Sequence, residues 1–519
     1  MALTLSINGQ ITEATPGLSL FDHAERLGIA VPTSCQKQGK CRECIVEVTE
    51  GTEHLSAPAP EERHLSAPFR LSCRARVGQV SGLPRIVCHT MRRGRMRIES
   101  SGRSRTICHE PAQGHGLAMD LGTTTIVLRL YNLETGDLIA DTSFENPQRF
   151  GGSDVMSRIH YDTTHPGRLL MRTLAGYLSR AIAEFPVDPR SIAEMVVVGN
   201  STMRDLFFRK SVYSIGQNPY RSITEIEMAE GRRATTALTE TGRRSLLPIH
   251  PDARVWGAPV LSGHVGADAA ACMLAVDIAH EDRVVAIMDI GTNTELIVGN
   301  RHRILAASCP AGPAFEGGAI SCGMPALDGA IEDFAVGEDG AFRLGVIGGS
   351  APTGICGSGL VDVLSELLRT GRMNELGRFD VPRIDLAPGV WFTENDASEL
   401  AQAKGANAAG LHVVFDTYGI AFDDIDVFYL AGGFGRHLKT EASRRVGLIP
   451  DLPDAKIVQI GNAAIEGASI ALLARSKRDE LEELVRRVEH CRLETHPRFF
   501  DYFVEGCHFR PTGTVTRYV

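Results

Sequence analysis

Four cysteines near the start of the chain have the spacing that a small inorganic cluster requires. Cys35, Cys41 and Cys44 share one short segment, and Cys73 follows after 28 further residues. A 2Fe–2S cluster needs four thiolates, and the first gap here is one residue longer than in the plant-type ferredoxin pattern. A zinc knuckle usually has two Cys-x2-Cys pairs, and only one is present. The spacing therefore favours a 2Fe–2S cluster over a zinc site or unliganded core cysteines.

Two similar turns indicate a second kind of chemistry. Asp120–Thr125 and Asp289–Thr294 both follow an apolar run and both contain Asp-x-Gly-Thr, 169 residues apart. Glycine allows close approach of the backbone to a ligand, and threonine hydroxyls and turn N–H groups bind phosphate oxygens. An aspartate beside them can hold hydrated Mg²⁺, so we assign this role to Asp120 and Asp289. The other candidate nucleotide-binding residues of the two loops are Gly122, Thr123, Thr124, Gly291, Thr292 and Asn293.

The elements around the two turns also repeat. Each half is predicted to contain a hairpin, a third strand, a helix and a strand that ends in glycine, so that Val197–Asn200 corresponds to Leu430–Gly433. Such an internal repeat predicts a duplicated ribonuclease-H-like fold with nucleotide in the cleft between its halves. We expect the first half, with an insertion, over 115–275, and the second over 276–519. The chain lacks Gly-x-x-x-x-Gly-Lys-Ser/Thr, which argues against a Walker-type loop.

The cysteines need a separate small domain. Residues 3–9 alternate apolar and polar side chains, and Ser19 can cap a short helix over 20–27. This strand–helix context predicts a β-grasp ferredoxin domain over residues 1–80. Residues 81–114 are basic and rich in Gly and Ser, which predicts a solvated linker. Its Cys88-His89 and Cys108-His109 pairs are an alternative metal site. Adjacent side chains on a strand point to opposite faces, which argues against that site.

Bulk properties exclude several classes of protein. A chain of 519 residues is too long for one core, which predicts several domains. The net charge of -9 argues against a general nucleic-acid binder. We see no apolar run long enough for a membrane helix and no signal peptide, so we expect a cytoplasmic protein without membrane contact. Twelve cysteines without a secretion signal suggest thiolate chemistry.

The paired turns resemble those of the superfamily that contains acetate and sugar kinases, heat-shock ATPases and actin. In that superfamily the two Asp-x-Gly-Thr hairpins bind phosphate, and a Gly-Gly-x-Gly turn contacts adenosine. The resemblance assigns the adenosine contact to Gly432, Gly433 and Gly435. It covers about residues 115–480.

Together with the N-terminal cysteines, the chain resembles the reductive activators of corrinoid proteins. Its matching segments are Asp120–Thr125, Asn146–Gln148, Gly152–Ser157, Gly199–Met203, Gly312–Gly317, Gly354–Gly359 and Leu430–Gly435. The resemblance implies return of an inactive Co(II) corrinoid to Co(I), with ATP and an electron from the cluster. The implied partners are a corrinoid protein of a methyltransferase system and an upstream electron donor, and a homodimer is compatible with the sequence. Two departures are Gln36-Lys37-Gln38, where relatives usually carry glycines, and a short basic linker in place of a structured one.

We expect ATP to drive a conformational clamp rather than to phosphorylate a metabolite. Glu316 is the candidate for orienting or deprotonating the attacking water, and its alternative role is a loop carboxylate bonded to nearby backbone N–H groups. Two other functions stay open at this point. One is a small-molecule kinase with a fused redox-sensing ferredoxin, and the other is a nucleotide-gated electron carrier or chaperone without corrinoid activity.

Overall fold

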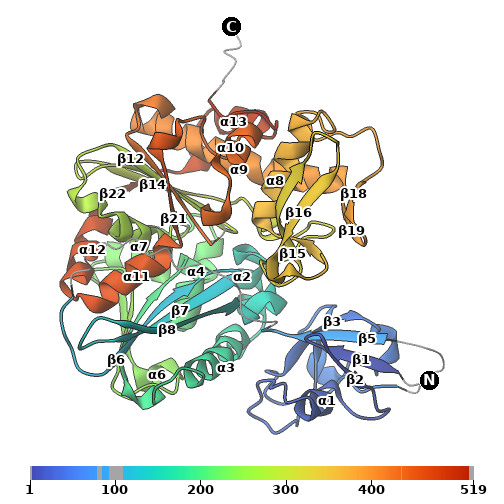
Figure 1. Ribbon diagram of the computed structural model, residues 1–519. Coiled ribbons are helices and arrows are strands. Elements are labelled where there is room, and N and C mark those ends of the chain that lie inside the picture. The colour runs from blue at the N-terminus through green and yellow to red at the C-terminus, as the bar shows by residue number, and fades with distance from the viewer. Residues whose placement is uncertain (1–2, 79–84, 93–108, 434, 514–519) are drawn as a thin grey trace.

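The computed structural model describes residues 3–78, 85–92, 109–433 and 435–513. A small N-terminal domain lies beside a larger body made of two α/β halves (Figure 1). The elements follow in chain order through the small domain, the first half and the second half. The predicted combination of a ferredoxin-like domain with a duplicated α/β body is confirmed.

The N-terminal domain is built on one five-stranded sheet with the order β2-β1-β5-β3-β4. Ser19 caps the helix as predicted: its hydroxyl accepts from the N–H of Asp22, and the Asp22 carboxylate accepts from the N–H of Ser19. The elements are β1 Thr4–Ile7, β2 Gln10–Glu13, α1 Leu20–Arg26, β3 Ile45–Glu50, β4 Phe69–Leu71 and β5 Arg85–Thr90.

The predicted linker over 81–114 is wrong for residues 85–90. They form β5, which pairs in parallel with β1 and antiparallel with β3, so it is the central strand of the sheet. Ile86 and Cys88 point into the core, and this alternation was masked by the basic composition around it. The N-terminal domain therefore extends about ten residues beyond the predicted boundary at residue 80. Cys108 and most of the arginine-rich segment lie outside the described residues.

The first half contains a six-stranded sheet with the order β10-β11-β9-β6-β7-β8. Its strands are β6 His115–Leu121, β7 Thr125–Asn132, β8 Leu138–Glu145, β9 Ile192–Val198, β10 Leu238–Thr241 and β11 Arg254–Gly257. Its helices are α2 Val155–Thr164, α3 Leu169–Ala183, α4 Ser201–Phe207, α5 Ile223–Ala229, α6 Gly242–Ser245 and α7 Ala267–Val276.

The second half repeats this arrangement with the order β21-β20-β12-β13-β14-β22. The strands of this sheet are β12 Val285–Ile290, β13 Thr294–Gly299, β14 Ile304–Cys309, β20 Val427–Ala431, β21 Ile457–Gly461 and β22 Val488–His490. Two smaller sheets contain β15 Ala330–Val336, β16 Phe342–Val346 and β17 Gly354–Ile355, and β18 Ile384–Ala387 and β19 Val390–Phe392. The helices are α8 Gly357–Arg369, α9 Glu394–Tyr418, α10 Thr440–Val446, α11 Ala463–Leu473, α12 Ser476–Arg487 and α13 Phe499–Gly506.

Five strands of each sheet confirm the internal repeat, and the edge strands β10 and β22 have no counterpart in the other half. The hairpin β6–β7 corresponds to β12–β13, and β9 corresponds to β20, each parallel to the first strand of its hairpin. Gly199 and Gly432 occupy equivalent places after β9 and β20, with φ of 145° and 110°. A Cβ at Gly199 would lie 2.5 Å from the Leu121 carbonyl oxygen, and one at Gly432 would lie 2.3 Å from that of Ile290. Only glycine allows each strand end to approach the neighbouring phosphate turn this closely.

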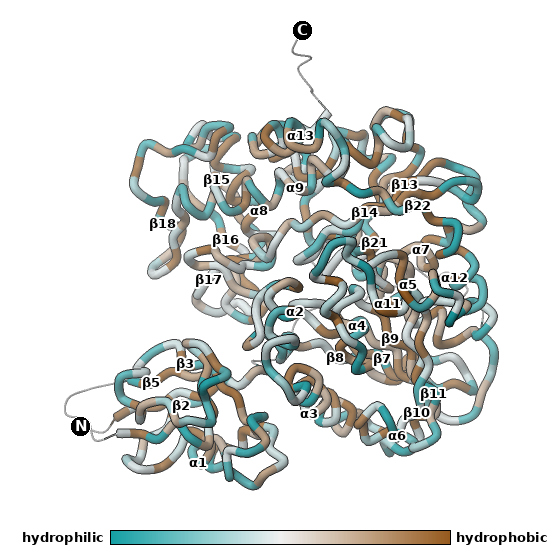
Figure 2. Tube along the Cα trace, turned by 180° about the vertical axis from the view of Figure 1, so that it is seen from behind, coloured by the Kyte–Doolittle hydropathy of each residue, from teal (hydrophilic) through white to brown (hydrophobic). Residues whose placement is uncertain are grey.

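Helices α7 and α11 join the halves through one shared core. Buried side chains from both sheets and both helices belong to a single apolar cluster, and Figure 2 shows hydrophobic segments concentrated in this region. Small residues allow the helices to pack closely, because a Cβ at Gly467 would lie only 2.0 Å from the backbone oxygen of Ala271. A tight helix pair therefore joins the two halves, and Asp268 of α7 and Ala464 of α11 line the cleft between them.

Gly467→Ala is expected to lower the free energy of unfolding by about 1–3 kcal/mol, because the added methyl group overpacks this contact. Gly176→Ala on α3 is the matched control. Its Cβ would meet Pro32 at an ordinary 3.4 Å, so helix propensity should leave the stability unchanged or raise it by about 0.5–1 kcal/mol. Chemical denaturation of both variants checks the prediction. Equal stability of the two would contradict the close approach of α7 and α11.

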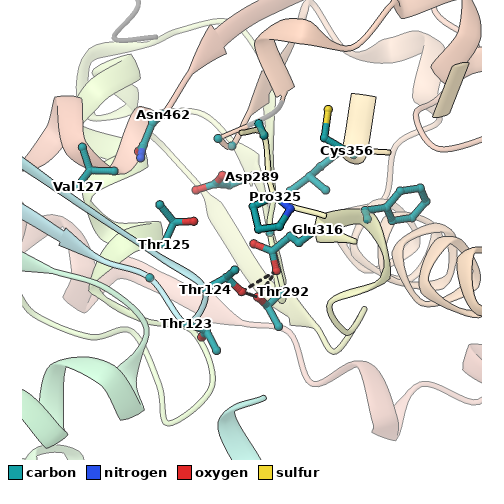
Figure 3. Close-up of a pocket in the computed structure, with 18 of the residues that line it drawn as sticks. Thr123, Thr124, Thr125, Val127, Asp289, Thr292, Glu316, Pro325, Cys356 and Asn462 are labelled. Atoms are coloured by element: carbon teal, nitrogen blue, oxygen red, sulfur yellow. Dashed lines mark hydrogen bonds between the residues drawn. The ribbon is translucent and has the colours of Figure 1, made fainter. Parts of the chain in front are cut away.

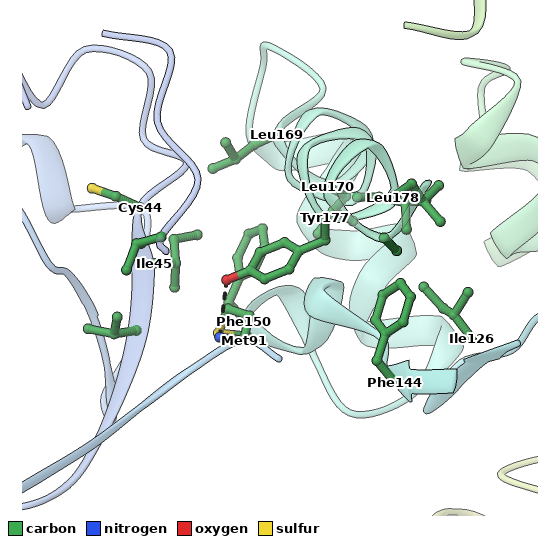
Figure 4. Close-up of a cluster of buried hydrophobic side chains, with 14 of the residues drawn as sticks. Cys44, Ile45, Met91, Ile126, Phe144, Phe150, Leu169, Leu170, Tyr177 and Leu178 are labelled. Atoms are coloured by element: carbon green, nitrogen blue, oxygen red, sulfur yellow. Dashed lines mark hydrogen bonds between the residues drawn. The ribbon is translucent and has the colours of Figure 1, made fainter. Parts of the chain in front are cut away.

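The N-terminal domain packs against α3 of the first half. The Met91 N–H donates to the Tyr177 hydroxyl at 3.2 Å, within a joint apolar cluster that includes Ile45 and Phe150 (Figure 4). Arg149 forms an ion pair with Glu47 at 2.9 Å. These contacts fix the domain that carries the four cysteines on the half that carries the first phosphate turn.

Candidate functional site

The two Asp-x-Gly-Thr turns face each other across the cleft between the halves. The hydroxyl oxygens of Thr124 and Thr292 lie 2.8 Å apart, although the residues are 168 positions apart in the sequence. The cleft is lined by both turns, and its walls include Asn200, Phe315, Cys356 and Asn462 (Figure 3). The structure thus brings the residues of both predicted loops into one site.

Glu316 joins the two turns. It ends the short 3₁₀ helix Ala314–Glu316, and one carboxylate oxygen accepts from the Thr124 hydroxyl at 2.9 Å and from the Thr292 hydroxyl (Figure 3). Burial raises the pKa of Glu316, and the two hydroxyl groups and the charge of Arg158 oppose this shift. The alternative role as a carboxylate bonded to nearby backbone N–H groups is wrong among the described residues, because its partners are hydroxyls of the two phosphate turns.

Asp120 and Asp289 lie deep in the same cleft. Burial raises the pKa of Asp120 to about 7; the Asn462 side-chain amide, which donates to it at 2.9 Å, opposes this shift, and the charge of Asp289 adds to it. Burial also raises the pKa of Asp289 to about 6, and a hydrogen bond from the Cys272 thiol at 3.2 Å opposes the shift. Neither aspartate has a salt bridge to a basic side chain among the described residues.

Two further carboxylates, Asp268 and Glu295, extend this acidic group. Burial raises the pKa of Asp268 to about 7, with added repulsion from Asp120 and Asp289. Burial and the charges of Asp268 and Asp289 raise the pKa of Glu295 well above its usual value. All four carboxylates line one cleft, and carboxylate oxygens are the donors that a hard divalent cation prefers. The chemistry of these donors therefore suits a hydrated Mg²⁺ better than a softer metal.

Sequence reasoning missed Asp268, Glu295 and the two capping asparagines. Glu295 carried a usable signal, because it lies directly opposite Asp289 in the hairpin register. Asn200 caps α4 and donates to the Thr123 hydroxyl at 2.8 Å, whereas Asn462 caps α11 and bonds Asp120. Asp268 follows the start of α7, and only the folded chain shows that it joins the cleft.

Asp268→Asn should stabilise the metal-free protein at pH 8 by about 1–3 kcal/mol, and much less at pH 5. A carboxyl whose pKa is raised by folding stabilises the folded state while protonated. Its contribution is complete below the usual pKa near 4 and is lost as the pH rises through about 7. Thermal unfolding of wild type and variant from pH 4 to 8 measures this slope. The same slope in both proteins would contradict the assignment.

The Gly-Gly-x-Gly turn lies at the far side of the cleft. Gly432 and Gly433 line it together with His437, and Gly435 begins the next 3₁₀ turn with its N–H bonded to the Gly432 carbonyl at 3.1 Å. Of the three predicted glycines, two therefore line the cleft, and Gly435 is bonded to one of them without lining the cleft itself. Gly122, Thr123, Gly291 and Asn293 also line the cleft.

The four cysteines converge in the N-terminal domain as two pairs. Cys35 lies beside Cys41, and Cys44 beside Cys73, and the charges of the two pairs act on each other. Burial would raise the pKa of Cys35, but nearby N–H groups, those of Cys41 first, lower it to about 7. Two thiolates for each of two irons, with backbone N–H groups directed at sulfur, fit a 2Fe–2S cluster.

The cysteine loop tolerates side chains where glycine would be easier. Gln36, Lys37 and Arg42 have φ of 50°, 67° and 60°, which is unfavourable for residues with a Cβ. The Lys37 ammonium group forms ion pairs with Asp22 at 2.9 Å and with Glu25 at 2.5 Å, both of which lie on α1. These two ion pairs hold the Lys37 side chain against α1.

Further thiols are buried in the fold. Cys88 is buried within the N-terminal sheet, and burial raises its pKa to about 12. His89 follows on the same strand and is less buried, in keeping with the expected alternation of faces. Cys272, Cys309 and Cys356 are buried near the cleft, and Cys272 bonds Asp289.

These features define an iron–sulfur ferredoxin domain fused to an actin-like ATPase body. The sequence matches the 2Fe-2S iron-sulfur cluster binding domain over residues 4–78, the RACo middle region over 115–281 and the C-terminal domain of RACo, the ASKHA domain, over 283–517. Among the described residues, every helix is too short or too polar to cross a bilayer.

Curated relatives agree with this class. The chain is 30% identical over 429 residues to the corrinoid activation enzyme RamQ of Eubacterium limosum, covering 76% of this chain and 70% of that protein. It is 26% identical over 417 residues to the [Co(II) methylated amine-specific corrinoid protein] reductase of Methanosarcina barkeri, covering 75% and 76%. The solved structure of a reductive activator for corrinoid, iron-sulfur protein shares the fold, with a TM-score of 0.71, 23% identity and 98% and 99% coverage. The chain belongs to this family of corrinoid-activating enzymes.

Proposed function

We propose that this protein performs ATP-dependent one-electron reduction of a corrinoid protein from Co(II) to Co(I), with the electron drawn from its own ferredoxin domain. One observation carries the proposal: a four-cysteine domain is packed on the ATPase half that contains Thr124, whose hydroxyl meets Thr292 of the other half. Movement of the two halves about bound nucleotide would therefore act on the body that carries the electron-transfer domain.

Within this proposal each group has a defined task. Cys35, Cys41, Cys44 and Cys73 would hold a 2Fe–2S cluster, which accepts and releases one electron at a time. Asp120 and Asp289, with Asp268 and Glu295, would hold Mg²⁺ beside the phosphates. Glu316 would orient or deprotonate the attacking water, since its carboxylate lies between the hydroxyls of both turns.

The need for ATP follows from the energetics of the electron. Plant-type clusters have potentials near about -400 mV, and an acceptor lower by roughly 240 mV makes the transfer uphill by about 5.5 kcal/mol. A differential affinity of about 10⁴ between two conformations has the same size. Closure of the halves around nucleotide can thus offset the unfavourable electron transfer if the closed state binds the Co(I) form of the corrinoid protein more tightly than the Co(II) form.

The anaerobic reaction with a Co(II) corrinoid protein and a reductant tests the proposal. Formation of the Co(I) absorption band should require both the protein and ATP. Reduction at the full rate without ATP would favour a nucleotide-gated or simple electron carrier. Transfer of phosphate to a small acceptor, without Co(I), would favour the kinase.

A further inference from the structure

One buried arginine lacks the carboxylate partner that the others have. Arg70, Arg129, Arg204 and Arg478 are all nearly inaccessible, and each forms a salt bridge of 2.5–2.9 Å with a glutamate or aspartate. Arg158 is only 1% exposed, yet no carboxylate lies within salt-bridge distance of it among the described residues. A buried guanidinium without a counter-charge is strongly unfavourable. Its position therefore indicates an anionic ligand.

The surroundings of Arg158 hold its side chain in place without neutralising it. It lies on α2, where Nε donates to the Gly152 carbonyl at 3.0 Å and Nη1 to the Met203 sulfur at 3.2 Å. Burial lowers its pKa to about 9, and the charges of Asp154 and Glu316 oppose the shift. A carbonyl and a thioether orient the guanidinium, and Nη2 keeps no hydrogen-bond acceptor within the described part of the chain.

The buried Arg158 side chain borders a chamber beside the nucleotide cleft. Its walls come from the N-terminal domain, from α2 and from residues 313–325, and they include Arg158. Thr123, Thr124 and Glu316 line both the chamber and the nucleotide cleft. The chamber therefore opens at the first phosphate turn, where the end of a polyphosphate chain would lie.

We propose that Arg158 binds a phosphoryl group at this junction, either the terminal phosphate of ATP or free inorganic phosphate. The proposal rests on the proposed nucleotide site, and it does not depend on corrinoid reduction. A guanidinium forms two parallel hydrogen bonds with phosphate oxygens, and such charge-assisted bonds are strong in a buried site. If the group that binds is the third phosphate, Arg158 would distinguish ATP from ADP.

The substitution Arg158→Met tests this role in the full-length protein. It removes an unpaired buried charge and fills the space with an apolar chain, so the nucleotide-free variant should melt no lower than wild type. Its affinity for the β,γ-imido analogue of ATP should fall by about tenfold or more, while ADP binding changes by less than about twofold. Arg158→Lys keeps the charge and should give an intermediate loss. Arg63→Gln, which removes an exposed charge from the chamber wall, is the matched control and should bind both nucleotides normally.

Calorimetric titrations distinguish the two sources of phosphate. If phosphate binds the wild-type ADP complex and not that of Arg158→Met, the site holds the free ion. If only the ATP analogue is affected, the site holds the terminal phosphate. Equal losses for ADP and the analogue, or no loss for the analogue and for phosphate, would overturn the proposal. A lower melting temperature of both nucleotide-free Arg158 variants would also overturn it, because the charge would then serve the fold. None of these readouts requires Co(I) formation, so they stay valid if the proposed reduction fails.

Discussion

Asp289→Asn is expected to abolish ATP-dependent formation of Co(I), by about 100-fold or more, while the absorption spectrum of the cluster stays intact. Asparagine has the same shape, but it lacks the charge that a divalent cation requires. Folding should be preserved, because burial already disfavours the ionised carboxylate and raises its pKa to about 6. The measurement is the rate of Co(I) formation with ATP and Mg²⁺, read beside the visible spectrum.

The control for this variant is Asp252→Asn. Asp252 is an exposed aspartate of the first half, with 79% of its side chain accessible and its nearest arginine 4.0 Å away. This control should activate the partner at the wild-type rate. Normal activation by Asp289→Asn would sink the assignment of the cleft as the Mg²⁺–ATP site.

Cys73→Ser should lose the cluster and keep nucleotide binding. The serine side chain cannot replace a thiolate that lies beside Cys44 and is 2% exposed, so the variant should lose the visible absorption of the cluster and all Co(I) formation. Nucleotide binding should persist, because the cleft residues belong to the two halves of the ATPase body and not to the N-terminal domain. Iron and sulfide content, with nucleotide affinity measured on the same sample, checks both halves of the prediction.

Cys88→Ser provides the matched control. Cys88 is equally buried in the same small domain, but it lies on β5, and burial is the cause of its raised pKa, without a contribution from the four predicted cluster cysteines. This variant should retain iron, sulfide and activity. Zinc in place of iron in the wild-type protein, or a cluster that survives in Cys73→Ser, would contradict the 2Fe–2S assignment.

The sequence predicted the parts of the fold that carry local signals. The Ser19 cap, the two Gly-Thr turns and the glycines at 199 and 432 each impose a backbone conformation, and a repeat of that pattern specifies the duplicated fold. Strand β5 was not predicted, because the basic residues around it obscured the alternation of apolar and polar side chains. A central strand that closes a sheet is defined by its pairing with β1 and β3, which are distant in sequence.

The site residues were predictable where a reactive side chain lies in a turn with a recognisable sequence. Asp120 and Asp289 adjoin glycine turns, whereas Asp268 lies in the first turn of the alanine-rich helix α7 and reaches the cleft only through the packing of α7 on α11. Arg158 was likewise not predictable, because the absence of a carboxylate within salt-bridge distance is visible only once its described neighbours have been placed. Side chains brought together by tertiary packing leave no spacing to recognise.

The bonds of Glu316 make nucleotide binding an exchange between competing anions. Each threonine hydroxyl has a single proton to donate, and in this structure Thr124 and Thr292 both donate to the same carboxylate. A phosphate oxygen that accepts a hydrogen bond from either hydroxyl would displace Glu316 and leave its carboxylate able to accept from water. If Glu316 is the proposed base, arrival of the nucleotide would release it, and an empty cleft would keep it occupied.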